Sequence, residues 1–188
     1  MKFTPVFSAI VLSLQFSNSL AADSSVSCQP VSGTLQQLLP DDSCTVYTAQ
    51  KKYFPDLTFL TLASPSPLPI LFPPYCYSGT FVGQLGTTAT INGTVFSGLT
   101  ENNFNLLEAL TAASVININA VDAIDGKIKE LGTLYTNDSI SSPVFMTTER
   151  LTMIAGSKIF KDAQGYIDIS GNAIAGPTSF TGTLCPAK

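Results

Sequence analysis

The sequence predicts an all-β protein whose antiparallel strands close into a barrel. The tripeptide Gly-Thr-apolar occurs five times in stretches that read as strands, at Gly33–Leu35, Gly79–Phe81, Gly93–Val95, Gly132–Leu134 and Gly182–Leu184. Thr and apolar residues favour a pleated, half-buried surface, and Gly within a strand marks a bend or the close approach of another backbone. A small closed sheet requires both properties. The irregular spacing of the copies excludes a solenoid or propeller of fixed period.

Alternation of polar and apolar residues is the second observation. In residues 115–121, Asn117 and Asn119 fall on one face and Ile116 and Ile118 on the other, which is the period of a half-buried strand. Between punctuating Gly, Asn, Asp and Pro residues, we expect further strands at Val31–Leu38, Thr45–Ala49, Leu57–Leu62, Tyr77–Gly83, Thr88–Phe96, Ile128–Thr136, Phe145–Ile154, Tyr166–Ser170 and Ser179–Cys185. Strands in this number and at this spacing are typical of an antiparallel barrel.

Helix is expected to be scarce. Phe104–Ala112 contains helix formers, and Lys158–Ala163 can form one turn before Gly165 ends it, but neither stretch is long enough for a layer. The segment 64–74 is rich in proline, which removes backbone donors, so it is predicted to be an extended, polyproline-like connection. Its apolar residues pack on the outside of the barrel in one interpretation and cover the barrel mouth in the other.

The N-terminus reads as a signal peptide. Lys2 precedes a mostly apolar run from Phe3 to Phe16, and Ser19-Leu20-Ala21 offers the small residues that suit signal peptidase, so we predict cleavage after Ala21. The run is shorter than the roughly 20 residues needed to span a bilayer. We therefore expect a signal peptide at residues 1–21 and a single barrel domain at residues 22–188, secreted from the cell or, in a bacterium, periplasmic.

Composition and charge exclude several classes of partner. The net charge is -4 and the basic residues are scattered, which argues against nucleic acid. The strands lack the aromatic girdles of a membrane-embedded barrel, and no cationic helix face suits a membrane surface. The chain has no His and no two Cys residues two to four positions apart, so neither a metal site nor another cofactor is expected. The absence of His also excludes imidazole-based catalytic triads.

The order of strands and turns near the C-terminus carries a family resemblance. Residues 149–156 read as a strand, followed by Phe160, the turn Ala163-Gln164-Gly165 and a closing strand at residues 180–184, and Ala112–Thr136 with its Asp125-Gly126 turn forms the hairpin before them. In this order the chain resembles the allene-oxide-cyclase-like and dirigent-like barrels over roughly residues 79–185.

The resemblance implies an eight-stranded calycin-type barrel. For plant members it also implies cyclisation of an epoxy fatty acid, or steering of phenolic radical coupling, by polar residues inside the barrel. No residue of this chain is matched to those polar residues, so none is carried over.

Glu149 is the candidate catalytic residue. Without His, the chemistry available is that of carboxylate, Tyr and Lys side chains. Strand alternation places Glu149 on the same face as Phe145, Leu151 and Met153, and a carboxylate on an apolar face has either a partner or a raised pKa. In the alternative interpretation the alternation slips by one residue, or Glu149 pairs with a Lys at the barrel rim.

Other polar residues have simpler interpretations. Arg150, the only arginine, and Asp168 fall on the polar, solvated faces of their strands. Asn92 and Asn137 each begin an Asn-x-Ser/Thr triplet, which is an N-glycosylation acceptor if the host is a eukaryote.

Three functions fit this sequence. The first is non-catalytic binding of a small apolar ligand, because an eight-stranded barrel is either packed or just able to hold one ligand. The second is an isomerase or cyclase that resembles the allene oxide cyclases and acts on a lipid-derived substrate. The third is a structural or interaction protein whose lumen is filled with side chains. Protein partners are not predicted.

The barrel hypothesis selects one disulfide pairing. An exported chain meets an oxidising compartment, so its four cysteines are expected to form two bridges. Closure of a barrel sets the start of the first strand beside the end of the last, which predicts a bridge between Cys28 and Cys185. Cys44 is then left to pair with Cys76. The most local rival pairing joins Cys28 to Cys44.

Overall fold

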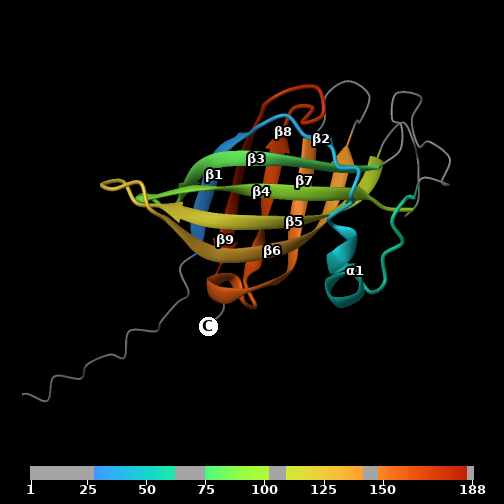
Figure 1. The fold of residues 1–188 in the computed structure, drawn as a ribbon, viewed down its shortest axis with the longest axis horizontal. Coiled ribbons are helices and arrows are strands. Elements are labelled where there is room, and N and C mark those ends of the chain that lie inside the picture. The colour runs from blue at the N-terminus through green and yellow to red at the C-terminus, as the bar shows by residue number, and fades with distance from the viewer. Residues whose placement is uncertain (1–27, 62–74, 102–108, 142–147, 186–188) are drawn as a thin grey trace, which may run out of the picture.

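The computed structural model describes residues 28–61, 75–101, 109–141 and 148–185. Its elements (Figure 1) are, in chain order, β1 (Gln29–Leu35), β2 (Leu39–Pro40), α1 (Tyr47–Tyr53), β3 (Cys76–Leu85), β4 (Ala89–Leu99), β5 (Ala109–Val121), β6 (Ile128–Ser141), β7 (Thr148–Gly156), η1 (Lys158–Phe160), β8 (Gln164–Ser170) and β9 (Thr178–Cys185). The signal peptide predicted at residues 1–21 and the proline-rich connection predicted at 64–74 lie outside the described residues.

The strands close into a barrel. They form one antiparallel sheet in the order β1-β9-β8-β7-β6-β5-β4-β3-β2, and an additional pairing of β1 with β3 completes the ring. The short strand β2 lies beside β3, with Leu39 opposite Ser78, and is the one strand outside the closed ring. The predicted fold class, an all-β closed antiparallel eight-stranded barrel with little helix, is confirmed.

The five Gly-Thr-apolar tripeptides share one orientation. In each of them the last residue is buried in the core, with at most 6% of its surface exposed: these residues are Leu35, Phe81, Val95, Leu134 and Leu184. The preceding Thr points outward because successive residues of a strand alternate between faces. The Gly therefore faces the lumen. The repeated tripeptide thus builds the inner wall of the barrel.

Gly93 shows why the inner wall needs glycine. A Cβ atom at this position would lie 2.6 Å from the Phe81 ring and would also overlap the backbone oxygen of Asn117 on β5. The Phe81 ring occupies the space that the missing side chain leaves and meets Phe180 edge to face, with ring centroids 5.8 Å apart. Glycine therefore makes room for aromatic rings inside a narrow barrel.

A second apolar cluster lies outside the ring. Val46, Phe54 and Phe59, from α1 and its flanking segments, pack with Cys76 and Ala113 on the outer face of the sheet. The expectation of a strand at Thr45–Ala49 was wrong, because helix α1 forms there instead. Ala49, Gln50 and the two lysines of the last turn favour helix, and the apolar residues on either side bind the segment to the sheet.

Two further expectations about local structure were wrong. In the described part of Leu57–Leu62, the only strand pairing is an isolated bridge between Phe59 and Thr100. Of the helix expected at Phe104–Ala112, residues 109–112 begin strand β5 instead, and the remainder lies outside the described residues. The strand pairing available to these residues in a closed barrel outweighs their helix propensity.

Both predicted disulfides are present. Cys28 pairs with Cys185 across the first and last strands, with 4.0 Å between their Cα atoms, and Cys44 pairs with Cys76, with 5.2 Å between theirs. The first bridge extends the register in which Gln29 lies opposite Leu184. The second holds the segment before α1 against the start of β3. Two disulfides indicate that the protein folds in an oxidising compartment.

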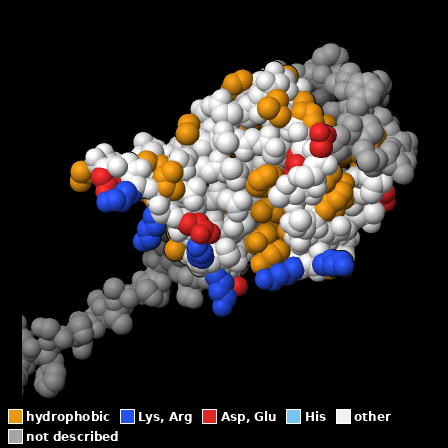
Figure 2. Space-filling model, viewed as in Figure 1, with side chains coloured by type: hydrophobic (Ala, Val, Ile, Leu, Met, Phe, Trp, Pro, Cys, Tyr) orange, Lys and Arg blue, Asp and Glu red, His pale blue; other side chains and the backbone are white. Residues whose placement is uncertain are grey.

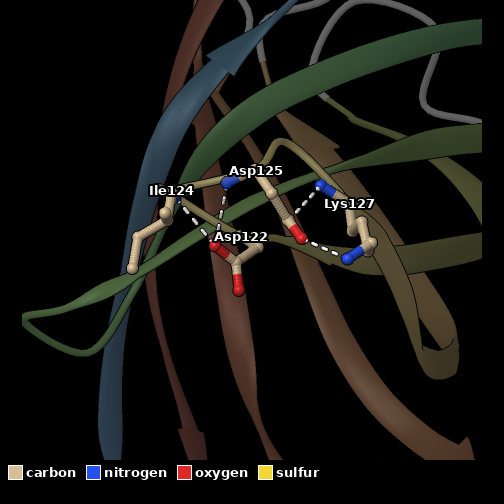
Figure 3. Close-up of polar contacts among 4 residues, drawn as sticks. All are labelled: Asp122, Ile124, Asp125 and Lys127. Carbon is tan, nitrogen blue, oxygen red and sulfur yellow. Dashed lines mark hydrogen bonds and ion pairs between the residues drawn. The ribbon is translucent and has the colours of Figure 1, made fainter.

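The turn between β5 and β6 forms where Asp125-Gly126 predicts it. Figure 3 shows the Asp122 carboxylate accepting hydrogen bonds from the backbone N–H groups of Ile124 (2.7 Å) and Asp125 (3.3 Å). Asp125 in turn accepts from the backbone of Lys127 and forms an ion pair with its side chain. Gly126 adopts a φ of 68°, a conformation that glycine reaches without strain. Local turn chemistry therefore sets the register of the longest hairpin.

Candidate functional site: a carboxyl pair inside the barrel

The lumen is apolar over much of its length. Its cavity has a volume of about 30 Å³ and is lined by Ile, Leu, Val and Phe side chains, including Phe81, Ile116, Leu151, Ile167 and Phe180. That space holds about one water molecule. A site for a drug-sized ligand has roughly ten times this volume. The apolar part of the lumen is therefore close to filled by its own side chains.

A polar row crosses the inner wall nearer to one end. At consecutive register positions of β3, β4, β5 and β6 lie Tyr77, Ser97, Ser114 and Thr136, all buried. They face inward because they alternate in phase with the apolar lumen residues of the same strands. The row lies toward the end of the barrel where β6 finishes at Ser141 and β7 begins, called here the β6–β7 end.

Asp138 lies one layer beyond this row. It follows Thr136 by two residues on β6 and is 3% exposed. Ser114 Oγ donates to Asp138 Oδ2, and Thr136 Oγ1 donates to Asp138 Oδ1 at 2.6 Å. Burial raises the pKa of Asp138 to about 7, although both hydrogen bonds favour its ionised form. Hydrogen bonds therefore fix the position of the Asp138 carboxyl group, and burial makes its ionisation unfavourable.

Glu149 occupies the next layer toward the β6–β7 end. It lies opposite Ile140, whereas Asp138 lies opposite Leu151, so the two acidic residues are diagonal neighbours across β6 and β7. Such positions are about 7 to 8 Å apart. Glu149 is only partly buried, unlike Asp138. Surrounding protein atoms and the charge of Asp138 together raise the pKa of Glu149 to about 8.

The structure places Glu149 as strand alternation predicts, on the inner face with Leu151 and Met153. Phe145, the fourth residue assigned to this face, lies outside the described residues. Within the described part of the chain, ion pairs join Lys127 to Asp125, Arg150 to Asp168 and Lys158 to Glu130, and none includes Glu149. The alternative of a rim Lys paired with Glu149 therefore finds no support there.

Asp138 and its two hydroxyl donors were missed by sequence reasoning. The expected strand ended at Thr136, and Asp138 was considered only as the middle residue of an Asn-x-Ser triplet. The signal was nevertheless present, because Leu134, Thr136, Asp138 and Ile140 alternate in one phase. Extending the strand by four residues would have placed Asp138 on the inner face.

Arg150 and Asp168 lie on the outside of the barrel. The Arg150 guanidinium donates from Nε to Asp168 Oδ1 and from Nη2 to Asp168 Oδ2, each at 2.7 Å, and it lies 4.4 Å from the centre of the Tyr166 ring. The hydrogen bonds and charge of Arg150 lower the pKa of Asp168. The outward orientation was predicted, whereas the ion pair was not.

The two glycosylation triplets also face outward. Asn92 on β4 accepts a hydrogen bond from Asn119 Nδ2 at 3.4 Å and is partly buried. Asn137 on β6 is exposed, between the inward-facing Thr136 and Asp138. An attached glycan at Asn137 would therefore project away from the carboxyl pair.

In the part of the chain that the structure describes, no helix has the length and apolar character needed to cross a bilayer. Nor do three or more Cys, Asp, Glu or His side chains of the described residues gather as a potential metal site. The chain matches no protein-family model, no curated protein and no solved structure.

Proposed function

We propose that this chain is a secreted acid–base catalyst of the isomerase or cyclase class, which acts on a small uncharged substrate at the β6–β7 end of the barrel. The observation that carries the proposal is the Asp138–Glu149 pair. Two carboxyl groups on the inner wall of an apolar barrel have raised pKa values, and such groups cluster at functional sites. A carboxylic acid that stays protonated near neutral pH is a proton donor suited to that pH.

The two carboxyl groups have different roles in this proposal. Asp138 accepts hydrogen bonds from Ser114 and Thr136, which stabilise its anion. Glu149 has no hydrogen-bond donor among the described residues, and the Asp138 anion favours its protonated form. The proton that the pair shares therefore resides mainly on Glu149, which is also the more accessible of the two.

In the reaction step, Glu149 transfers its carboxyl proton to an oxygen atom of the substrate, such as an epoxide or carbonyl oxygen. The electron pair of the opening C–O or C=O bond moves to that oxygen as the new O–H bond forms. A proton lost from the rearranged substrate then returns to the Glu149 carboxylate. The sum is an isomerisation, with no other reactant consumed.

The filled apolar cavity makes simple binding of an apolar ligand the weaker proposal. A cavity of about 30 Å³ does not admit a fatty acid chain into that part of the lumen. The same observation favours the structural alternative, a barrel with a packed lumen. That alternative gives no reason for two raised-pKa carboxyl groups on the inner wall. It is the outcome against which the proposal is tested.

The test compares Glu149→Gln with Glu130→Gln. Glu130 lies exposed on β6 and pairs with Lys158, so its replacement removes a similar charge without touching the lumen. The substrate probe is a small uncharged epoxide, cyclohexene oxide, and its isomerisation to the allylic alcohol is followed by chiral chromatography and mass spectrometry. We expect the wild-type protein and Glu130→Gln to isomerise it, and Glu149→Gln to be about 100-fold slower or worse. Near-UV circular dichroism verifies that each variant folds.

The proposal is excluded if the wild-type protein isomerises neither this epoxide nor an unsaturated ketone of similar size faster than the uncatalysed reaction in buffer. Turnover that Glu149→Gln retains in full would also exclude Glu149 as the acid. Either result favours the packed-lumen alternative.

A further inference from the structure

A groove crosses the outside of the barrel, away from the carboxyl pair. It has a volume of about 390 Å³ and lies between the β3–β4 strand pair and the segment that follows β1. Figure 1 shows this segment running along β3 to reach β2. The volume falls in the range of small-molecule sites. The groove is therefore large enough to hold a small ligand.

Four outward-facing side chains form the floor of the groove. Ser78 lies opposite Phe96, and Thr80 lies opposite Thr94, in the register of β3 and β4. Directly opposed residues in an antiparallel pair have Cβ atoms about 5 Å apart. The floor is thus a compact block of three hydroxyl groups and one aromatic ring.

The Thr94 hydroxyl is fixed from behind. Asn117 Nδ2 donates to Thr94 Oγ1 at 3.2 Å, and Thr133 Oγ1 donates to Asn117 Oδ1 at 2.9 Å. Because Thr94 Oγ1 accepts from Asn117, its own hydrogen points elsewhere and is available to a ligand. A relay across three strands therefore orients a donor at the floor of the groove.

The wall of the groove adds amide and apolar groups. Gln36 and Gln37 supply amides, and the Gln37 Nε2 atom donates to the backbone oxygen of Ile174 at 2.8 Å, which fixes the wall to the barrel. The Gln36 backbone N–H donates to Thr80 oxygen at 2.8 Å. Leu39, beside Ser78, is 58% exposed. The wall of the groove thus presents both amide groups and apolar surface to a ligand.

The groove carries no charge of its own. Its lining, as far as the structure describes it, consists of uncharged residues. In Figure 2 the Lys and Arg side chains lie along the lower edge and at the protruding hairpin, away from β3 and β4. An anionic ligand would find no counter-ion here, and burying its charge without one is unfavourable.

We propose that this groove binds a neutral oligosaccharide. Hydroxyl and amide groups each donate and accept hydrogen bonds, which matches the hydroxyl groups of a sugar. The Phe96 ring and Leu39 offer apolar surface to the C–H face of a pyranose ring. The site is independent of the carboxyl pair and of the activity proposed for it.

The test is a binding titration with uncharged tetrasaccharides of glucose, mannose and N-acetylglucosamine, followed by NMR chemical shifts of backbone amides. For this experiment the protein is produced by export to the bacterial periplasm, where disulfides form and no N-linked glycan is attached at Asn92. We expect binding of at least one probe with Kd near 1 mM or tighter, and shifts confined to the segment 36–40, β3 and β4. Thr94→Val and Ser78→Ala should each weaken this binding about tenfold.

Thr90→Val is the matched control. Thr90 lies exposed on the same face of β4, outside the groove lining, so its loss should leave the affinity unchanged. Glu149→Gln should also leave it unchanged, which separates this proposal from the catalytic one. Absence of binding at 10 mM of every probe (about tenfold above the expected Kd) overturns the proposal. Equal weakening by Thr90→Val and Thr94→Val, or preference for a sulfated saccharide, overturns it as well.

Discussion

Raising the pH from 5 to 7 should destabilise the folded barrel, because the native state holds protons that the unfolded chain releases. Unfolded carboxyl groups titrate near 3.8 for Asp and 4.5 for Glu, whereas burial raises the pKa of Asp138 to about 7 and that of Glu149 to about 8. Between these limits the folded state binds more protons than the unfolded state. The free energy of unfolding therefore falls as the pH rises.

The expected size follows from proton linkage. Each extra proton held by the native state changes the free energy of unfolding by about 1.4 kcal/mol per pH unit, and both carboxyl groups stay largely protonated in the folded state below pH 7, so the pair gives up to about 5 kcal/mol between pH 5 and 7. This stabilisation is fully present below about pH 4 and is lost as the pH passes through 7 to 8. The lowered pKa values of Asp41, Asp125 and Asp168 act in the opposite direction, but only below pH 3.8.

Urea unfolding followed by far-UV circular dichroism at pH 5, 6 and 7 measures the effect. Glu149→Gln keeps the shape of the protonated side chain but cannot ionise, so the pH slope should drop by about one proton and the variant should be more stable than wild type at pH 7. Glu130→Gln, with its exposed site, should retain the wild-type slope. A wild-type stability that is flat or rises from pH 5 to 7 would refute the reasoning.

Three other predictions concern the scaffold. Gly93→Ala should lower the free energy of unfolding by about 3 kcal/mol or prevent folding, because its Cβ would overlap the Asn117 oxygen and the Phe81 ring; Gly176→Ala, with no atom within 4 Å of its Cβ, should be neutral in the same urea assay. Replacing both Cys28 and Cys185 by Ser should remove about 5 kcal/mol, more than loss of the other bridge, because the residues it joins are 157 apart rather than 32. Arg150→Ala should leave the thermal midpoint unchanged, since its ion pair is exposed.

The barrel was predictable because its closure depends on local patterns that repeat. Each Gly-Thr-apolar tripeptide places a small residue and a buried residue on the inner wall, and this holds from Leu35 in β1 to Leu184 in β9. The Cys28–Cys185 bridge follows from closure alone. Helix α1 was not predictable from alternation, because Val46 and Phe54 are buried against the outside of the sheet rather than within it.

Of the carboxyl pair, only Glu149 was predictable from the sequence, because its strand has the clearer alternation. Glu149 follows an alternation that includes two clearly apolar neighbours, Leu151 and Met153. Asp138 alternates with Thr136, a residue common on both faces of a strand, so its inward orientation leaves a weaker signal. The outer groove combines residues from β3, β4 and the segment after β1, which only the register brings together. Patterns within one segment cannot show such a site.

The stability of Glu149→Gln also bears on function. If the carboxyl pair existed to hold the barrel together, replacing Glu149 by its uncharged isostere would destabilise the protein at neutral pH. The raised pKa values of Glu149 and Asp138 predict the opposite, because each carboxylate is less favourable inside the fold than in water. A variant that is both more stable and inactive would separate folding from catalysis at this one position. A variant that is less stable at pH 7 and equally active would instead place Glu149 in the scaffold, and the acid–base proposal would lose the observation on which it rests.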